Sequence, residues 1–112
     1  MSRIGRYLNR TVEVWRVVLA DDGGGGQDQM WVHESTQHGR RSQPTARERQ
    51  AADQAEARLD YTWYFDTRAD VRRGDELREP GMVHAVFAVF EPSGPGTYLR
   101  ADCTTRQPTN TN

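Results

Sequence analysis

The chain has 112 residues, with 15 basic and 16 acidic side chains and a formal net charge of −1. This length suits one small domain with a modest core, and the balanced charge argues against binding nucleic acid or an acidic membrane through overall charge. Cys103 is the only cysteine, which excludes an intrachain disulfide and a cysteine-based zinc site. No apolar run is long enough to span a bilayer, and the first residues lack the apolar core of a signal peptide. We therefore expect a protein made and used in a cytoplasm, or as part of something assembled there.

All 15 basic residues are arginine, and the chain contains no lysine. A host genome rich in G and C is one explanation. Arginine also suits protein interfaces, because its planar guanidinium pairs with carboxylates and is weakly hydrated. The composition is therefore compatible with an assembly protein without requiring one.

Residues 1–10 form a basic segment that contains apolar side chains at helical spacing, and no acid occurs before Glu13. The basic residues are Arg3, Arg6 and Arg10, and the apolar ones are Ile4, Tyr7 and Leu8. Two interpretations stay open: an arm that docks on a partner, and a solvated terminus of the kind that is common in small domains.

Residues 11–34 have the pattern of a β-hairpin. Over residues 11–19 the apolar positions change from one face to the other near Trp15, which predicts a bulge there. Residues 21–28 contain four successive glycines, but two aspartates precede these and no Lys-Ser/Thr follows, so we predict a hairpin loop and not a phosphate-binding loop. The second strand is expected over residues 30–34, with a third, edge-like strand over residues 36–43.

Residues 44–58 are the one convincing helix. Pro44 prevents an earlier start, and Thr45 with Glu48 forms a capping-box pattern. The apolar face consists almost entirely of alanine, so it buries little area and the helix is marginal alone. We infer that neighbouring molecules order this helix, which favours assembly over catalysis.

The remaining sequence alternates like strands separated by turns. Strands are expected over residues 59–65, 82–91 and 98–103, with a glycine turn at Gly74 followed by a further short strand. The fold class is mainly β: a small antiparallel β-barrel or sandwich of six or seven strands with one helical insert. The organisation is an N-terminal docking arm at 1–10, a domain at 11–106 with its helical insert at 44–58, and a disordered tail at 107–112. We expect the core to rest on Val14, Trp63, Phe87 and Val89.

No arrangement of residues that supports catalysis or metal binding emerges from the sequence. Ser35 and Ser42 lie near His33 and His38 but without a nucleophile motif, and the histidine spacing, including His84, matches no familiar metal site. We expect no enzyme activity, no cofactor and no metal. Five aromatic residues, interpreted as mostly core, offer the alternative of a small barrel that binds single-stranded nucleic acid: Trp15, Trp31, Tyr61, Trp63 and Tyr64. A toxin-like small enzyme is a weaker third possibility.

Four segments, taken in order, resemble the head closure proteins of tailed phages, also called head-tail stoppers or connectors. They are Ile4-Gly5-Arg6 with Leu8–Arg16, Ser42–Arg49 with Ala52–Ala55, Asp70–Leu77, and Pro95–Cys103. The second resembles the helical insert of the branch found in actinobacterial phages, and the lysine-free composition agrees with such a host. The resemblance covers almost the whole chain through order and spacing, while residues 61–65 are more aromatic than the family pattern.

The resemblance implies a structural protein that forms a ring, of six subunits, at the head-tail junction of a siphophage. The ring would close the portal channel after DNA packaging and provide a docking surface for the tail. Expected partners are other copies of the chain, the head-tail adaptor and portal, a tail terminator or tail tube protein, and packaged DNA without sequence-specific binding; no membrane is expected. The protein would be assembled in the bacterial cytoplasm and located in the virion.

Two segments are the candidate partner-binding regions. The N-terminal arm would dock on the preceding ring of the connector, and the helical segment would lie between subunits. The residues concerned are Arg3, Ile4, Arg6, Tyr7, Leu8, Arg40, Arg41, Arg47, Glu48, Arg49 and Arg58.

Overall fold

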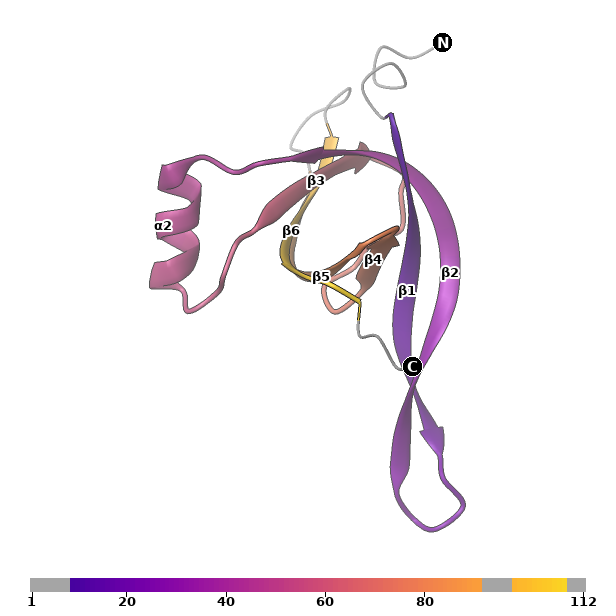
Figure 1. Ribbon diagram of the computed structural model, residues 1–112. Coiled ribbons are helices and arrows are strands. Elements are labelled where there is room, and N and C mark those ends of the chain that lie inside the picture. Colours follow the sequence, from indigo (N-terminus) through magenta and orange to yellow (C-terminus); the bar gives the residue numbers. More distant parts are fainter. Residues whose placement is uncertain (1–8, 92–97, 109–112) are drawn as a thin grey trace.

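Six antiparallel strands close into a barrel in the computed structural model, which describes residues 9–91 and 98–108 (Figure 1). The elements are β1 (Arg10–Asp21), β2 (Gln27–Ser42), α2 (Ala46–Gln54), β3 (Tyr61–Asp66), β4 (Glu76–Glu79), β5 (Met82–Phe90) and β6 (Tyr98–Arg106). The strand order around the barrel is β1-β2-β3-β6-β5-β4, and β4 pairs with β1 to close it. The mainly β class with one helical insert is confirmed.

The β1–β2 hairpin is longer than the barrel that it helps to build. Its register shifts between Val14 and Trp15, which confirms the predicted bulge, and the glycine-rich loop follows β1 as predicted. Beyond the barrel, the hairpin continues as a two-stranded ribbon that projects from the molecule (Figure 1).

The expectation of separate strands at 30–34 and 36–43 is wrong, because β2 runs without a break from Gln27 to Ser42. Its first part pairs with β1 as far as Gly39, and its last part pairs with β3. The edge-like character is confirmed, because β2 pairs only with β1 before Gly39, but the polar stretch does not mark a strand end.

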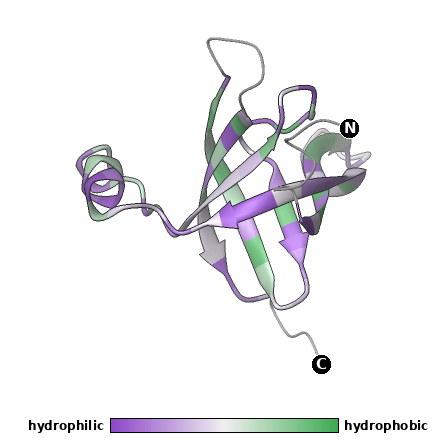
Figure 2. Ribbon diagram, turned by 90° about the horizontal axis from the view of Figure 1, so that it is seen from above, coloured by the Kyte–Doolittle hydropathy of each residue, from purple (hydrophilic) through white to green (hydrophobic). Residues whose placement is uncertain are grey.

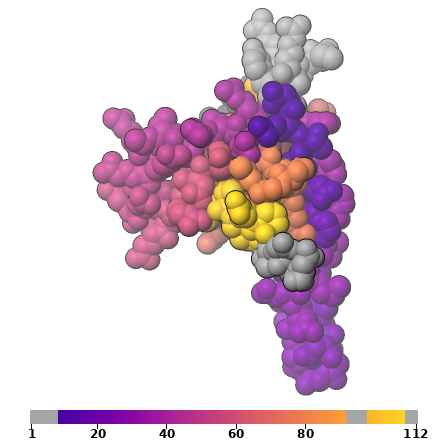
Figure 3. Space-filling model, in the orientation of Figure 1, coloured from indigo at the N-terminus to yellow at the C-terminus, as the bar shows by residue number. Residues whose placement is uncertain are grey.

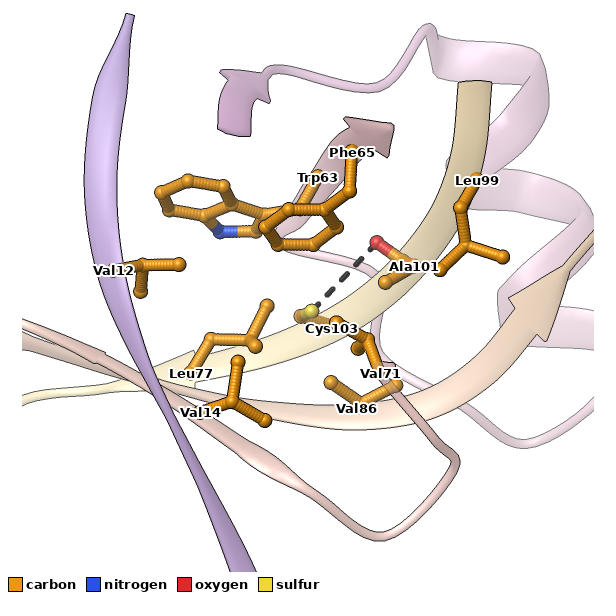
Figure 4. Close-up of a cluster of buried hydrophobic side chains, with 10 residues drawn as sticks. All are labelled: Val12, Val14, Trp63, Phe65, Val71, Leu77, Val86, Leu99, Ala101 and Cys103. Atoms are coloured by element: carbon orange, nitrogen blue, oxygen red, sulfur yellow. Dashed lines mark hydrogen bonds between the residues drawn. The ribbon is translucent and has the colours of Figure 1, made fainter. Parts of the chain in front are cut away.

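Side chains from β1, β3, β4, β5 and β6, together with Val71, fill the inside of the barrel (Figure 4). It consists of Val12, Val14, Trp63, Phe65, Val71, Leu77, Val86, Leu99, Ala101 and Cys103. The rings of Trp63 and Phe65 stack with centroids 5.7 Å apart, and Gly39 lies directly against them. Gly39 is required here by space, since a Cβ on it would lie 2.6 Å from a ring carbon of Phe65.

The expectation that Phe87 anchors the core is wrong. The β5–β6 register shifts between Val86 and Ala88, so Phe87 is the extra residue of a bulge and is half-buried, while Val86 faces the core. Val14 and Trp63 are confirmed as fully buried, and Val89 packs against the core while partly buried. A bulge reverses every face assignment that follows it, which strict alternation does not reveal.

An ion network fixes the β3–β4 connection to β1. The buried carboxylate of Asp75 accepts hydrogen bonds from Arg16 at 2.9 and 3.0 Å and from the Arg72 amide at 2.8 Å. These bonds, together with Asp70, raise the pKa of the Arg16 guanidinium above its usual value. Gly74, at φ 94°, makes the turn before β4 as predicted.

Helix α2 stands apart from the barrel, joined to it by its two flanking segments (Figure 2). None of its nine residues is buried against the described part of the chain. It ends four residues earlier than the predicted 44–58, because Glu56 adopts φ 61° and the Ala57 amide donates back to the Ala52 carbonyl at 2.9 Å.

Candidate functional site

The start of α2 is held by the capping box that the sequence predicts. The Glu48 amide donates to Thr45 Oγ1 at 3.1 Å, and the Thr45 amide donates to Glu48 Oε1 at 2.9 Å. The bond from the Thr45 amide, with a smaller effect of Arg100, lowers the pKa of the Glu48 carboxyl below its usual value. The helix therefore forms from local bonds and does not depend on packing against the barrel.

One ion pair links α2 to the barrel. Glu48 Oε2 lies 3.1 Å from a terminal guanidinium nitrogen of Arg100 on β6, and Arg100 also binds Asp102 at 2.9 Å. The hydrogen bond to Asp102 comes first among the causes that raise the pKa of Arg100. After the helix, Arg58 donates to the Thr105 carbonyl and to Asp60. These contacts set where α2 lies without covering its faces.

Between α2 and the barrel lies an open groove of about 570 Å³, which we call the α2 groove. One wall consists of small residues on and after the helix: Ala51, Ala52, Ala55 and Ala57. The other wall comes from β5 and β6 and includes Phe87 and Phe90, with Arg73 and Arg100 at the groove as well. Phe90 is 51% exposed, so the groove presents aromatic surface.

The sequence-based candidates at the helical segment separate into two groups. Arg40, Arg47 and Arg49 are exposed, and none of them has an ion-pair partner among the described residues. Arg41, Glu48 and Arg58 are instead engaged within the subunit. The candidates Arg3, Ile4, Arg6, Tyr7 and Leu8 lie outside the described residues, as do the loop at 92–97 and the tail from 109.

Arg41 belongs to the barrel, where it pairs with the largely buried carboxylate of Glu79. It donates to Glu79 at 3.1 Å and lies over the Tyr61 ring, 4.8 Å from the ring centroid. The Glu79 carboxylate also lies 2.6 Å from the ring of the fully buried His84, whose other nitrogen contacts Thr105 at 2.6 Å. Each of these polar groups has a partner, so the cluster is structural.

The sequence did not single out the α2 groove or the outer part of the hairpin. We define the hairpin arm as residues 17–32, which projects from the body of the molecule (Figure 3). Among the described residues, most of the exposed large apolar side chains lie on this arm. The signal was present in the run Val17-Val18-Leu19, which is apolar on both faces and was assigned to a strand in the domain. The sequence indicates the α2 groove less clearly, because Phe90 follows the alternating pattern expected of a strand residue in the core.

Of the five aromatic residues interpreted as mostly core, Trp63 alone is buried, so that interpretation is wrong. Trp15, Tyr61 and Tyr64 are half-buried, and Trp31 is exposed. The guanidinium carbon of Arg78 lies over the rings of Trp15 and Trp31, 4.3 and 5.6 Å from their centroids. These two indoles therefore already have a cationic stacking partner within the chain.

Cys103 is buried in the barrel, and burial raises the pKa of its thiol above the usual value, so it is a packing residue. Across residues 9–91 and 98–108, no three metal-ligating side chains come together in a possible metal site. In the same ranges, no helix has the length and apolar character needed to cross a membrane.

A family model described as phage head completion protein matches residues 5–106, which is nearly the whole chain. No curated protein matches the chain. The matched range includes the barrel, the hairpin arm and α2. The chain therefore belongs to the phage head completion protein family, a family of structural phage proteins.

Proposed function

We propose that this head completion protein assembles into a ring of six subunits between the portal with its adaptor and the phage tail. Family membership gives it a structural role at the head-tail junction of the virion, in contact with other head and tail components. The ring itself is supported by α2, which stands away from its own barrel with uncovered faces. A helix that buries nothing within its subunit is well suited to contact another one.

The ring would close the portal channel after DNA packaging and provide the surface on which a tail terminator or tail tube protein docks. The ring would contact the DNA in the channel without sequence-specific binding. Assembly would take place in the cytoplasm of the bacterial host, and the lysine-free composition supports an actinobacterial siphophage.

Within this ring, α2 would lie at the boundary between subunits. Arg47 and Arg49 are exposed and free of ion pairs to the described residues, so both are available to a neighbour's carboxylates. Arg40 is equally exposed and would serve in the same way. Arg41, Glu48 and Arg58 would act indirectly, because they fix the barrel and the helix that present this surface.

The N-terminal segment would supply the second contact. The arginines at positions 3 and 6, with the apolar residues Ile4, Tyr7 and Leu8, would dock on the preceding ring of the connector. Basic and apolar side chains together suit an interface with a polar rim and an apolar centre.

The decisive experiment is to image the protein in purified virions by cryo-electron microscopy. We expect ring density at the head-tail junction into which the six-stranded barrel fits. Density elsewhere in the particle, or particles that lack the protein, would overturn the proposal. A salt-sensitive affinity of the isolated monomer for oligonucleotides would favour the nucleic-acid alternative instead.

A further inference from the structure

The hairpin arm, residues 17–32, has backbone edges that no other strand of the described chain occupies. β2 pairs only with β1 before Gly39, so its other edge is free along the arm. β1 pairs with β4 only as far as Trp15, and the next residue, Arg16, is held by the β3–β4 connection through Asp75. The edge of β2 is therefore the more open of the two.

This edge lacks the features that protect unpaired strands in natural sheets. Residues 27–33 pair with β1 without a register shift, and they contain no proline, lysine or arginine. Natural proteins place such residues or bulges on a free edge, because its exposed amides and carbonyls otherwise pair with another chain. A regular free edge of this kind indicates a partner that is itself an extended strand.

One face of the arm is partly covered, and the other is not. The guanidinium of Arg78 lies over the Trp31 ring on the first face, 5.6 Å from the ring centroid. Val18 pairs with Met30, and Val32 is two residues from Met30 along β2, so these three side chains share the second face. They are 38%, 52% and 38% exposed in the order Val18, Met30, Val32. A strand added beside β2 would pack its own apolar side chains against this second face.

The charge of the arm limits the choice of partner. Residues 17–32 contain three acidic side chains and no basic one. Asp21, Asp22 and Asp28 have no ion-pair partner among residues 9–91 and 98–108. Arms of neighbouring copies laid side by side would bring these like charges together, which disfavours a second arm as the added strand. A segment that carries arginine or lysine beside its apolar residues is favoured instead.

The arm and the N-terminal segment are connected to opposite ends of β1. The strand begins at Arg10, and the arm lies at its far end (Figure 1). In the proposed function the N-terminal segment docks on the preceding ring, which lies toward the head. The arm would then point toward the tail.

We propose that the hairpin arm is the tail-docking surface of the ring, where an extended, basic and apolar segment of the tail-side protein pairs as a third strand along residues 27–33. This inference rests on the proposed function, because it names the face and the kind of contact by which the ring meets the tail. Strand addition supplies affinity through backbone hydrogen bonds and specificity through alternate side chains. Because a two-stranded ribbon is marginal in water, the third strand also stabilises the arm.

Photo-cross-linking in complete virions tests this contact. The substitution Met30→p-benzoylphenylalanine is introduced into particles that carry tails, and covalent adducts are identified by mass spectrometry. We expect an adduct with a tail-side protein, within a stretch that has arginine or lysine among apolar residues. Thr67→p-benzoylphenylalanine, at an exposed position in the β3–β4 connection, is the matched control and should give no adduct with that stretch.

Joining of purified tails to filled heads gives a second measurement. Heads that carry Met30→Lys present a cation on the apolar face to a basic segment, so we expect infectious particles to form about tenfold more slowly, whereas Met30→Leu joins normally.

The charge of the arm is tested in the same assay. The triple variant Asp21→Asn with Asp22→Asn and Asp28→Asn removes three charges and keeps the oxygens that accept the loop amides of Gly23, Gly24 and Gly26. We expect slower joining that depends less on salt concentration than joining of the natural chain.

The outcomes separate the two proposals. The strand contact is overturned if position 30 gives no adduct in virions that contain the variant, or an adduct with the adaptor or with another copy of this chain. Heads that contain Met30→Lys and join tails at the natural rate would overturn it as well, and the cross-linking result decides alone if this variant does not enter heads. In each case the proposed function stands as long as imaging finds the natural chain at the junction. If the natural chain is absent from the junction, both proposals fall.

Discussion

Gly39 is the residue at which the barrel has least space. A Cβ there would lie 2.6 Å from a Phe65 ring carbon and 2.9 Å from a Trp63 ring carbon, and these two rings stack on each other in the core. Neither ring moves easily, because both are fully buried. The position is conspicuous only once β2 and β3 are paired, since nothing in the local sequence distinguishes it.

We predict that Gly39→Ala lowers the free energy of unfolding by about 1–3 kcal/mol, the usual cost of forcing extra volume into a packed core. Gly24→Ala is the control, because its Cβ would meet only an exposed carboxylate oxygen at 3.5 Å. Urea unfolding followed by tryptophan fluorescence measures both. Equal stability of the two variants would show that the aromatic pair can shift.

His84 makes stability depend on pH. Burial lowers the pKa of this imidazole, and although the Glu79 carboxylate opposes that effect, the pKa stays below its ordinary 6.5. Below about pH 6.5 the unfolded chain therefore binds a proton that the folded chain refuses, and the free energy of unfolding falls as the pH falls. The slope is at most about 1.4 kcal/mol per pH unit.

We predict that His84→Gln flattens this slope between about pH 6.5 and 5, whatever its effect on stability at neutral pH. The carboxyls with lowered pKa values, Glu48, Asp66 and Asp70, stabilise the fold above their ordinary range and lose that effect only at lower pH. Between about pH 6.5 and 5, the change in the free energy of unfolding is therefore expected to come from His84. Urea titrations at several pH values check the prediction, and an unchanged slope in the variant would contradict it.

Among the elements, α2 is the one whose stability comes from its own bonds. Its capping box is complete, yet none of its residues is buried against the described part of the chain. Loss of the cap therefore affects the helix and leaves the barrel as it is.

We predict that Thr45→Ala destabilises α2 by about 1 kcal/mol and speeds amide exchange of the helix, with no change for the barrel strands. Thr45→Ser keeps the acceptor oxygen and serves as the control. Hydrogen exchange followed by NMR makes the comparison. A loss of protection in β3 or β6 would show that the helix supports the barrel after all.

The elements also show how far the sequence alone predicts this fold. Where alternation is strict, as over residues 59–65, the strand was predicted apart from its start, which lies at Tyr61, and Trp63 was placed in the core correctly. Where a bulge intervenes at Phe87, or where β2 stays paired through polar residues, local pattern fails because pairing partners decide the outcome. The alanines after Gln54 continue the helical pattern, so the sequence does not reveal that α2 ends at Gln54 and that Glu56 adopts φ 61°.

The N-terminal segment belongs to assembly in our proposal, which leads to a further prediction. Deleting residues 2–9 should leave the isolated monomer folded, because the first strand starts at Arg10 and the core cluster starts at Val12. The variant should nevertheless fail to enter particles. Thermal unfolding of the monomer and immunoblots of purified particles test both halves, and an unfolded monomer would assign the segment to the core.

At the scale of the whole molecule, three features extend beyond or stand apart from a small barrel: the N-terminal segment in sequence, and the hairpin arm and α2 in space (Figures 1 and 2). The ring of strands is closed, but β2 before Gly39 pairs only with β1, so the outer hairpin keeps free backbone edges. The projections therefore offer both backbone edges and exposed side chains for association. This is the physical reason to seek the interface at the arm and the helix.

The charges of α2 allow a test of whether this helix lies at the boundary between subunits. Arg47 and Arg49 are exposed with no ion pair to the described residues, so in isolation they contribute little to the fold. Pairs with a neighbour's carboxylates would each add only about 0–1 kcal/mol, so a ring would combine several of them with apolar contact. Reversing two charges replaces attraction by repulsion at every subunit boundary of the ring at once. The loss of free energy of assembly is therefore larger than the contribution of a single ion pair.

We predict that Arg47→Glu with Arg49→Glu abolishes ring formation and leaves the monomer folded. Arg68→Glu with Arg72→Glu is the control, since it makes the same change in net charge at exposed residues of the β3–β4 connection. Sedimentation velocity over a range of concentrations reports the ring, and circular dichroism reports the fold. If the α2 variant assembles like the natural chain, the helix arginines lie outside the interface. If the control variant also fails to assemble, net charge is responsible and the location of α2 is not.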